Sequence, residues 1–293
     1  MRLGALEAGG TKMVCAIGDE KGNVCERESF PTRMPGDTLP ALIEYFQKRP
    51  IEALGIGSFG PLALDPRDAE YGCITTTPKP GWGHYPLRSA LMEALQVPVG
   101  IDTDVNAAAL AEMRLGAGKG TGSLVYYTIG TGVGGGAVVE GKLLHGLVHP
   151  EMGHMLLTPD PRDPHPEGFC PYHRSCLEGL ANGPAIQKRW GMSARDLPAD
   201  HVGWGIEAEY LAQMCVNTIL ILSPGRIVLG GGVMHRTHLF PMIRALTLQK
   251  LNGYVAHPAV TRDMDGYIVP PALGDNAGAA GALLLAAEAL KDQ

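Results

Sequence analysis

The sequence has no excess of basic residues, which excludes two classes of partner. Its 24 Lys and Arg residues stand against 30 Asp and Glu residues, a formal net charge of −6. A protein that binds DNA or RNA needs a basic face to neutralise phosphates. The Lys and Arg residues are also scattered rather than clustered, so the chain has no polybasic patch for a membrane surface. We therefore expect neither nucleic acid nor a membrane among the partners.

Long apolar runs and disulfide-like cysteine spacing are also absent. Glu7 lies where a signal peptide needs an unbroken apolar segment, and Gln213 and Asn217 interrupt the apolar stretch 211–222, which is too short to span a bilayer. Most of the six cysteines have no disulfide-like spacing. Without a secretory signal, close Cys and His clusters indicate a metal site rather than disulfides. These absences predict a cytoplasmic protein.

Glycine is abundant instead: 40 of the 293 residues are Gly, against a usual share of roughly 7%. Two glycine clusters each lie between short apolar segments. We predict one strand–turn–strand unit that is used twice, with strands at 3–6 and 13–18 around the first turn, and at 124–129 and 137–139 around a turn at 130–136.

Strands alternate with helices along the rest of the chain, which indicates an α/β fold. We predict further strands at 53–56, 99–101 and 226–229, and helices at 39–49, 87–96, from 102–104 to 115, 179–190, 206–222 and 276–290. Two domains follow from this order. The N-terminal domain covers 1–115, with the C-terminal segment 276–293 packing back on it, and the C-terminal domain covers 116–275.

The second glycine cluster resembles a dinucleotide-binding fingerprint. Gly130-x-Gly132-x-x-Gly135 is followed about 20 positions later by an acidic residue, Glu151. In a dinucleotide fold, however, the glycines must open a helix. Here the chain continues into the strand 137–139 and a Glu-Gly turn, which predicts a β-hairpin.

A hairpin turn of this kind can still bind phosphate, because exposed backbone N–H groups form an anion nest and glycine lets oxygens approach. Two such turns, with the hydroxyl groups of Thr11 and Thr131 as further donors, predict a site for a nucleotide triphosphate between the two domains. Ordinary hairpin turns are the alternative interpretation. No Gly-x4-Gly-Lys-Ser/Thr sequence occurs, which excludes a P-loop enzyme.

Asp104 is the strongest candidate for a catalytic carboxylate, because phosphoryl transfer needs a base that accepts a hydroxyl proton. We expect Asp102 and Asp104 to face different sides, so that only one of them faces the cleft. The alternative is that one of these residues merely caps the helix.

Cys170, His173 and Cys176 form a Cys-x2-His-x2-Cys cluster, and His154 lies 16 residues upstream as a candidate fourth ligand. Four N and S ligands suit a closed, structural zinc site. Incidental surface residues are the alternative. The segment 158–168 is rich in Pro, Asp and His, and we expect it to be a floppy loop without the metal as an anchor. Three competing histidines are interpreted as surface or loop residues: His145, His149 and His165.

The chain resembles the ROK sugar kinases of the actin/hexokinase-like ATPase superfamily over essentially its whole length. The resemblance rests on the order of six segments, namely the phosphate motifs Glu7–Lys12 and Thr128–Gly136, the catalytic segment Asp104–Ala109, the Glu-x-Gly-His sugar motif Glu151–His154, the end of the zinc motif Cys176–Glu178, and the adenosine motif Leu229–Val233. It implies two similar actin/hexokinase-like (ribonuclease H-like) α/β domains with an interdomain cleft, and a homodimer.

The resemblance also implies a role for each matching residue. Asp104 would deprotonate the acceptor hydroxyl. Sugar hydroxyls would be bound by Glu151, His154 and Glu178, and zinc by His154, Cys170, His173 and Cys176. ATP, with Mg2+ bridging its phosphates, would contact the residues of the three glycine motifs: Gly9, Gly10, Thr11, Lys12, Thr131, Gly132, Gly230, Gly231 and Gly232.

Three features differ from the common family pattern. Glu7 stands where many members have Asp, Cys-x2-His-x2-Cys replaces Cys-x-Cys-Gly-x2-Gly-Cys, and the loop 77–82 differs from that of glucokinase-like members. This Pro-Lys-Pro-Gly-Trp loop, the Glu-Ala-Gly-Gly-Thr-Lys opening and the Cys-Pro-Tyr-His run look like the bacterial fructokinase branch, which implies fructose as the acceptor. Glucose, mannose or an amino sugar are the alternatives.

A second alternative is a sugar-sensing repressor, since the same family contains such proteins. Those repressors carry a helix-turn-helix ahead of the kinase-like body. The first phosphate motif of this chain begins at residue 7, so we expect no such DNA-binding element before it.

Overall fold

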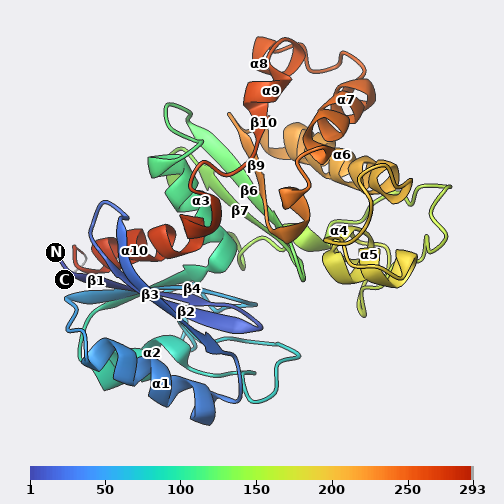
Figure 1. Cartoon of the computed structure of the whole chain (residues 1–293). Coiled ribbons are helices and arrows are strands. Elements are labelled where there is room, and N and C mark those ends of the chain that lie inside the picture. Colours follow the sequence, from blue (N-terminus) through green and yellow to red (C-terminus); the bar gives the residue numbers. More distant parts are fainter. Residues whose placement is uncertain (292–293) are drawn as a thin grey trace.

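Two five-stranded sheets, one from each half of the chain, form the centres of two lobes in this computed structural model, which describes residues 1–291. The first sheet has the order β3-β2-β1-β4-β5 and lies at the lower left of Figure 1. Its strands are β1 (Leu3–Ala8), β2 (Lys12–Gly18), β3 (Val24–Pro31), β4 (Ala53–Ser58) and β5 (Val99–Thr103). The second sheet has the order β10-β9-β6-β7-β8, with β6 (Ser123–Ile129), β7 (Val133–Val139), β8 (Lys142–Leu143), β9 (Ile227–Gly230) and β10 (Ile268–Val269).

Helices cover both faces of each sheet, which confirms the predicted α/β class (Figure 1). On the first sheet, one face packs against α1 (Pro35–Gln47) and α2 (Leu87–Leu95), and the other against α10 (Ala277–Ala289). On the second sheet, α3 (Asp104–Leu115) covers one face. The remaining helices gather on the other side of that sheet: α4 (Leu177–Ala181), α5 (Gly183–Trp190), α6 (Gly203–Leu222), α7 (Leu239–Leu251), α8 (Pro258–Thr261) and α9 (Met264–Tyr267).

Burial along the strands explains these layers. Every residue of β4 is buried, as expected for a parallel strand covered on both faces, whereas β3 at the sheet edge exposes most of its side chains. The charged residues of β3 discourage edge-to-edge pairing with another chain. Within residues 1–291, none of the helices combines the length and the apolar character that crossing a bilayer requires.

The repeated strand–turn–strand unit is confirmed. β1 pairs antiparallel with β2 and parallel with β4, and β6 pairs antiparallel with β7 and parallel with β9. The glycines at 130–132 therefore connect two strands of a hairpin, as predicted, and do not open a dinucleotide-binding helix.

Several predicted boundaries are wrong. The turn at 130–136 is too long, because Gly134, Gly135 and Gly136 belong to β7 and pair with β6. These glycines serve close packing instead: a Cβ on Gly136 would lie 2.4 Å from the carbonyl oxygen of Val105 in α3. The helix at 179–190 is two helices, because the Asn182 side chain accepts a hydrogen bond from Ala185 N (2.7 Å) and starts α5 anew.

Other differences concern segments with weak sequence signals. α1 begins at Pro35, four residues before its predicted start, because proline fits the first turn of a helix. The elements α7, α8, α9, β8 and β10 were not predicted. The predicted C-terminal segment 276–293 contains α10, and its last two residues, 292 and 293, lie outside the described part of the chain.

The contact between α3 and α10 depends on a missing side chain. A Cβ on Gly281 of α10 would lie 1.8 Å from the carbonyl oxygen of Ala107 in α3, so the two helix backbones touch. α10 also packs along β1 and β4, and α3 packs on β6 and β7. This backbone contact therefore joins the two lobes.

We predict that Gly281→Ala destabilises the protein even though alanine has the higher helix propensity. The added methyl group meets backbone, so the helices must separate, at a cost of roughly 1–3 kcal/mol in the free energy of unfolding. Gly36→Ala in α1 is the matched control, because a Cβ there meets nothing within 4 Å, and it should raise stability by up to about 1 kcal/mol. Urea unfolding measures both, and equal stability of Gly281→Ala and wild type would contradict the close contact.

Candidate active site

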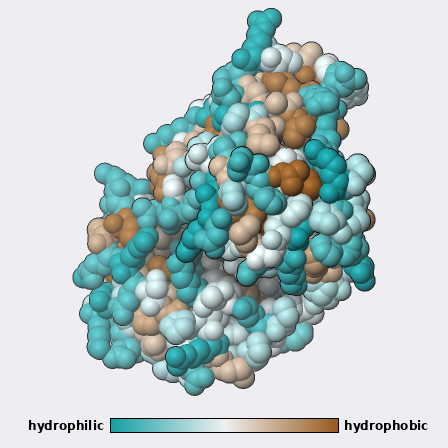
Figure 2. All heavy atoms as spheres, turned by 45° about the vertical axis from the view of Figure 1, so that its right-hand side comes forward, coloured by the Kyte–Doolittle hydropathy of each residue, from teal (hydrophilic) through white to brown (hydrophobic). Residues whose placement is uncertain are grey.

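The polar segments singled out in the sequence gather at the carboxyl ends of the parallel strands. In the first lobe, Ala8 pairs with Ser58 and Ser58 with Thr103, so the turn after β1 and the start of α3 share one sheet edge. In the second lobe, Thr128 pairs with Gly230, so the other two glycine motifs also share an edge. Ligands of open α/β sheets bind at such edges. Figure 2 shows a recess near the middle of one face, with hydrophilic residues around it.

Asp104 is the first residue of α3 and is partly buried. The cap of this helix is Thr103, whose Oγ1 accepts a hydrogen bond from Asn106 N (3.1 Å), so the alternative that an aspartate caps it is wrong. One oxygen of Asp104 accepts from Val105 N (2.9 Å). Burial, and to a lesser degree the negative charge of Glu151, raises the pKa of Asp104 to about 6, against the opposing hydrogen bond from Val105 N.

Asp102 points to a different environment, as predicted, but not because the chain is extended: Asp102 lies in β5, whereas Asp104 begins α3. It is 3% exposed, and its Oδ1 accepts from Asn106 Nδ2 (2.8 Å) and Thr103 N (2.7 Å). Its Oδ2 lies 2.8 Å from His145 Nε2. Asp102 therefore fixes the junction between β5 and α3, and Asp104 keeps a carboxylate oxygen for other contacts.

Glu7, in β1, is a second carboxyl group at this edge. Burial, and next the charge of Asp104, raises the pKa of Glu7 to about 7, while Lys12 and Arg27 lower it. Near neutral pH, both the protonated and the ionised form of this carboxyl group are therefore populated. A carboxylate oxygen in such an acidic setting is a ligand that Mg2+ accepts.

The turn Gly9–Lys12 follows Glu7 directly. Its backbone is tightened by a hydrogen bond from Gly9 N to Lys12 O (3.1 Å), and Thr11 and Lys12 are exposed. The predicted phosphate-binding residues of this motif, including Gly10, thus lie beside both acidic groups.

The second glycine turn is linked to α4. Glu178, in the first turn of α4, accepts a hydrogen bond from Val133 N at 3.0 Å, and its Oε2 would lie 2.7 Å from a Cβ on Gly132. Thr131, at the tip of the turn, is exposed. The structure thus brings a predicted sugar-binding residue against a predicted phosphate turn.

The third glycine motif packs on the end of β6. Gly231 has a φ of 89°, and a Cβ there would lie 2.5 Å from Ile129 N, so both its conformation and its surroundings require glycine. Gly230 lies against the Tyr126 hydroxyl, and a Cβ on Gly232 would meet nothing within 4 Å. Gly232 therefore leaves open space for a ligand next to the turn at 130–132.

Two histidines that we interpreted as surface or loop residues are built into this region. His149 is 5% exposed, its Nε2 accepts from Leu62 N (3.0 Å), and its Nδ1 lies 3.7 Å from Glu151 Oε1. Burial lowers the pKa of His149. The hydrogen bond that its ring accepts from Leu62 links residue 149 to the first lobe. The hydrogen bond to Asp102 raises the pKa of His145. The signal for both in the sequence is that they lie six and two residues before Glu151, where the Glu-x-Gly-His motif begins.

The interpretation of the third histidine is confirmed, since His165 lies in a loop, is partly exposed and pairs with Glu167 (3.2 Å). Glu151 lies at the border of the site. Burial, and next the negative charge of Glu178, raises the pKa of Glu151.

The four predicted metal ligands come together. The ligand atoms of His154, Cys170, His173 and Cys176 all lie within 4.8 Å of one another. His154 Nδ1 is 3.5 Å from Cys176 Sγ and 3.8 Å from Cys170 Sγ, and His173 Nδ1 is 3.9 Å from Cys170 Sγ. Tetrahedral zinc, with bonds of about 2.3 Å to S and about 2.0 Å to N, separates its ligands by roughly 3.5–3.8 Å. The cluster therefore fits a zinc ion.

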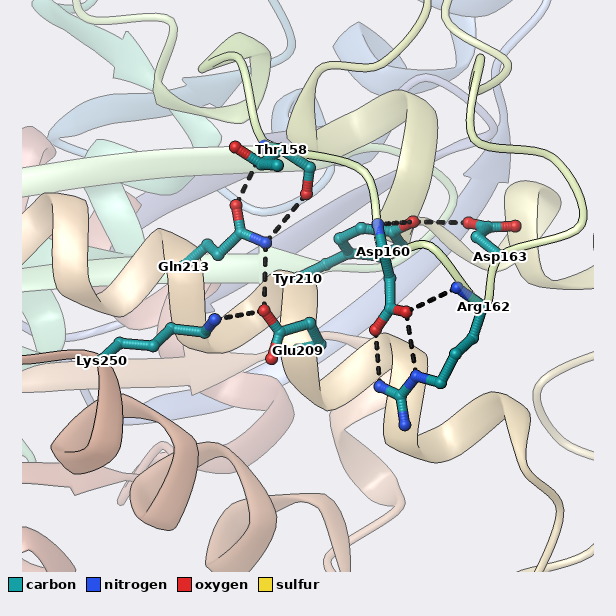
Figure 3. Close-up of polar contacts among 8 residues, drawn as sticks. All are labelled: Thr158, Asp160, Arg162, Asp163, Glu209, Tyr210, Gln213 and Lys250. Carbon is teal, nitrogen blue, oxygen red and sulfur yellow. Dashed lines mark hydrogen bonds and ion pairs between the residues drawn. The ribbon is translucent and has the colours of Figure 1, made fainter.

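The loop that joins His154 to Cys170 is bound by side chains of α6 (Figure 3). The Tyr210 hydroxyl on α6 accepts from Asp160 N and donates to Asp163 (2.6 Å), which forms a buried ion pair with Arg189. Gln213 bonds both backbone groups of Thr158. These contacts anchor the loop on α6 in addition to the predicted metal site.

Comparisons with known proteins agree with this arrangement. The model of the ROK family matches residues 3–289. The chain belongs to the ROK family.

Individual ROK relatives match along nearly the whole chain. A protein of Pediococcus pentosaceus named fructokinase is 48% identical over 292 residues, covering 100% of both chains. A fructokinase of Zymomonas mobilis subsp. mobilis is 45% identical, covering 97% of this chain and 95% of the relative. The crystal structure of a ROK hexokinase from Thermus thermophilus superposes with a TM-score of 0.81 at 29% identity, covering 100% of both chains. The two-lobed fold that the resemblance implied is therefore confirmed.

Proposed function

We propose that this chain is an ATP-dependent fructokinase. The observation that carries the proposal is the position of Asp104, a partly buried carboxyl group with a raised pKa at the sheet edge where the phosphate turn after β1 ends. ROK relatives of 45–48% identity that are named fructokinase support fructose as the acceptor.

In this proposal, Asp104 accepts the proton of a fructose hydroxyl while the oxygen of that hydroxyl attacks the γ-phosphorus of ATP. Glu151, His154 and Glu178 bind the other sugar hydroxyls. The backbone N–H groups of the glycine motifs, with Thr11, Lys12 and Thr131, hold the phosphates. The Glu7 carboxylate and the phosphates would hold Mg2+, which would supply positive charge against the negative charge that develops during the transfer.

In this proposal, the site lies between the two lobes, which close around the substrates. We take the predicted domains, residues 1–115 with α10 and residues 116–275, as the two closing units, with α3 at the boundary between them because it packs on both sheets. Lobe closure excludes water from phosphoryl transfer. The homodimer and the cytoplasmic location stay predictions.

Zinc has a positioning role in this proposal. His154 turns Nδ1 towards the two cysteines, which leaves Nε2 free for a sugar hydroxyl. Cys176 directly precedes α4, which carries Glu178. A closed site with four protein ligands orients both sugar-binding side chains and takes no part in the chemistry.

A coupled ADP assay with a panel of hexoses tests the acceptor. We expect the highest kcat/KM with fructose, because the relatives of 45–48% identity are named fructokinase. A higher value with glucose, mannose or an amino sugar would identify a ROK hexokinase of another specificity. ADP formation with none of the sugars would favour the sensor over the enzyme.

Replacement of the base gives the second test. Asp104→Asn should lower turnover by about 10²–10⁴ and leave fructose binding largely intact. In the wild type, kcat/KM should rise with pH through the Asp104 pKa of about 6, because the protonated acid accepts no proton. This acidic limb should be absent from the residual activity of Asp104→Asn. The control Asp200→Asn, in an exposed loop, should behave as wild type, and wild-type turnover of Asp104→Asn would remove Asp104 from the mechanism.

Metal analysis tests the zinc site. We expect close to one zinc per chain, and we expect Cys170→Ser to lose both the metal and thermal stability, because metal binding is coupled to folding. The exposed Cys25 provides the control, since Cys25→Ser should keep both. A metal-free preparation with full thermal stability would contradict a structural zinc ion.

A further inference from the structure

Lys79 reaches from the loop 75–83 to the first glycine turn. A Cβ on Gly10 would lie 3.0 Å from Lys79 Cε and 3.4 Å from Lys79 Nζ. The ammonium group therefore lies beside the backbone of the turn that we propose as a phosphate site. In the sequence, this lysine belongs to the Pro-Lys-Pro-Gly-Trp run that resembles the fructokinase branch.

The loop that carries Lys79 is anchored on both sides. Trp82 is 1% exposed, and its Nε1 donates to Arg33 O (2.7 Å) at the entry to α1. Its ring packs edge-on against Phe59 and Tyr85. Backbone hydrogen bonds at the base of the loop join His84 N to Thr75 O (3.1 Å). The position of Lys79 is thus set by buried contacts rather than by a free loop.

The charge of Lys79 is not compensated by protein groups. Among residues 1–291, its Nζ has no carboxylate within 4.0 Å and makes no hydrogen bond, although the side chain is partly buried. An anion bound at the glycine turn would therefore be the partner of this positive charge.

We propose that Lys79 binds the γ-phosphoryl group of ATP during its transfer to the sugar, an inference that rests on the proposed kinase function. The turn beside Lys79 follows β1, and Asp104 follows β5 at the same sheet edge, with β4 between them. The phosphoryl group next to the base is the one that is transferred. Lys79 is therefore on the γ-phosphate side, whereas Gly230–Gly232 belong to the other lobe.

The step is balanced without any further reactant. The sugar oxygen forms a bond to the γ-phosphorus, its proton goes to Asp104, and the bond between the γ-phosphorus and the bridging oxygen breaks, so that the electron pair leaves with ADP. Negative charge spreads over the three non-bridging oxygens of the transferred group. The Lys79 ammonium faces these oxygens, and a fixed positive charge is most effective where charge develops.

Lys79→Met tests the contact, because methionine keeps the length of the side chain and removes the charge. We expect kcat/KM with ATP and fructose to fall about 10²–10³-fold, the usual effect of removing one such group. Isothermal titration calorimetry in a buffer that contains Mg2+ measures nucleotide binding. Lys79→Met should bind a non-hydrolysable ATP analogue at least tenfold more weakly than the wild type, and should bind ADP, which lacks the γ-phosphate, with unchanged affinity. Lys79→Arg should recover part of the loss, and the exposed Lys119→Met should match the wild type.

The ratio of analogue affinity to ADP affinity separates the possible results. Wild-type turnover and an unchanged ratio in Lys79→Met would overturn the inference and leave the proposed kinase intact. Equal losses for the analogue and ADP, in Lys79→Met and also in Lys79→Gln, would overturn it in favour of a structural role. If the wild type forms no ADP with any hexose, the proposed function fails, and the same ratio still decides whether Lys79 contacts the γ-phosphate.

Discussion

The site depends on α3, which is pressed between the two lobes by backbone contacts that only glycine allows. Gly136 of β7 lies against Val105 O, and Gly281 of α10 lies against Ala107 O. Both contacts fall within the first turn of the helix that Asp104 begins. Interiors packed at this density transmit small displacements, so the position of the proposed base is fixed relative to both sheets at once. Hydrogen bonds from Asp102 to Asn106 and His145 also hold the start of α3 in place.

The electrostatics of the site follow from this placement. Glu7 and Asp104 are partly buried near each other, and each has a raised pKa mainly because burial penalises its charge. When ATP binds, its phosphates add negative charge to that of the two carboxyl groups. The positive charges of Lys79, Lys12 and a metal ion would offset it. On the other lobe, a continuous set of contacts runs from the Cys/His cluster through α4 and Glu178 to Val133 at the end of the second turn. In this account, sugar binding and phosphate binding share supporting residues.

Local signals in the sequence predicted much of the fold and of the candidate site. The two hairpins follow from alternating apolar segments around turns that need glycine, and the Cys/His spacing predicted four ligands that do meet. Tertiary contacts account for the failures. Gly134–Gly136 are glycines because α3 approaches β7, not because the chain turns. His149 and the loop 158–168 are ordered by residues far away in the sequence, Leu62 and Tyr210. Spacing within one segment carries no information about such partners.

The central claim is that Asp104 is held where its carboxyl group ionises only above its ordinary range. Carbon-13 NMR of protein labelled at the aspartate carboxyl carbons measures this directly, without turnover. The account predicts one signal that titrates near pH 6 in the wild type and is missing from Asp104→Asn. If every signal that disappears in this variant titrates near the ordinary aspartate value of about 3.9, Asp104 is an exposed acid of ordinary strength, and the account is contradicted.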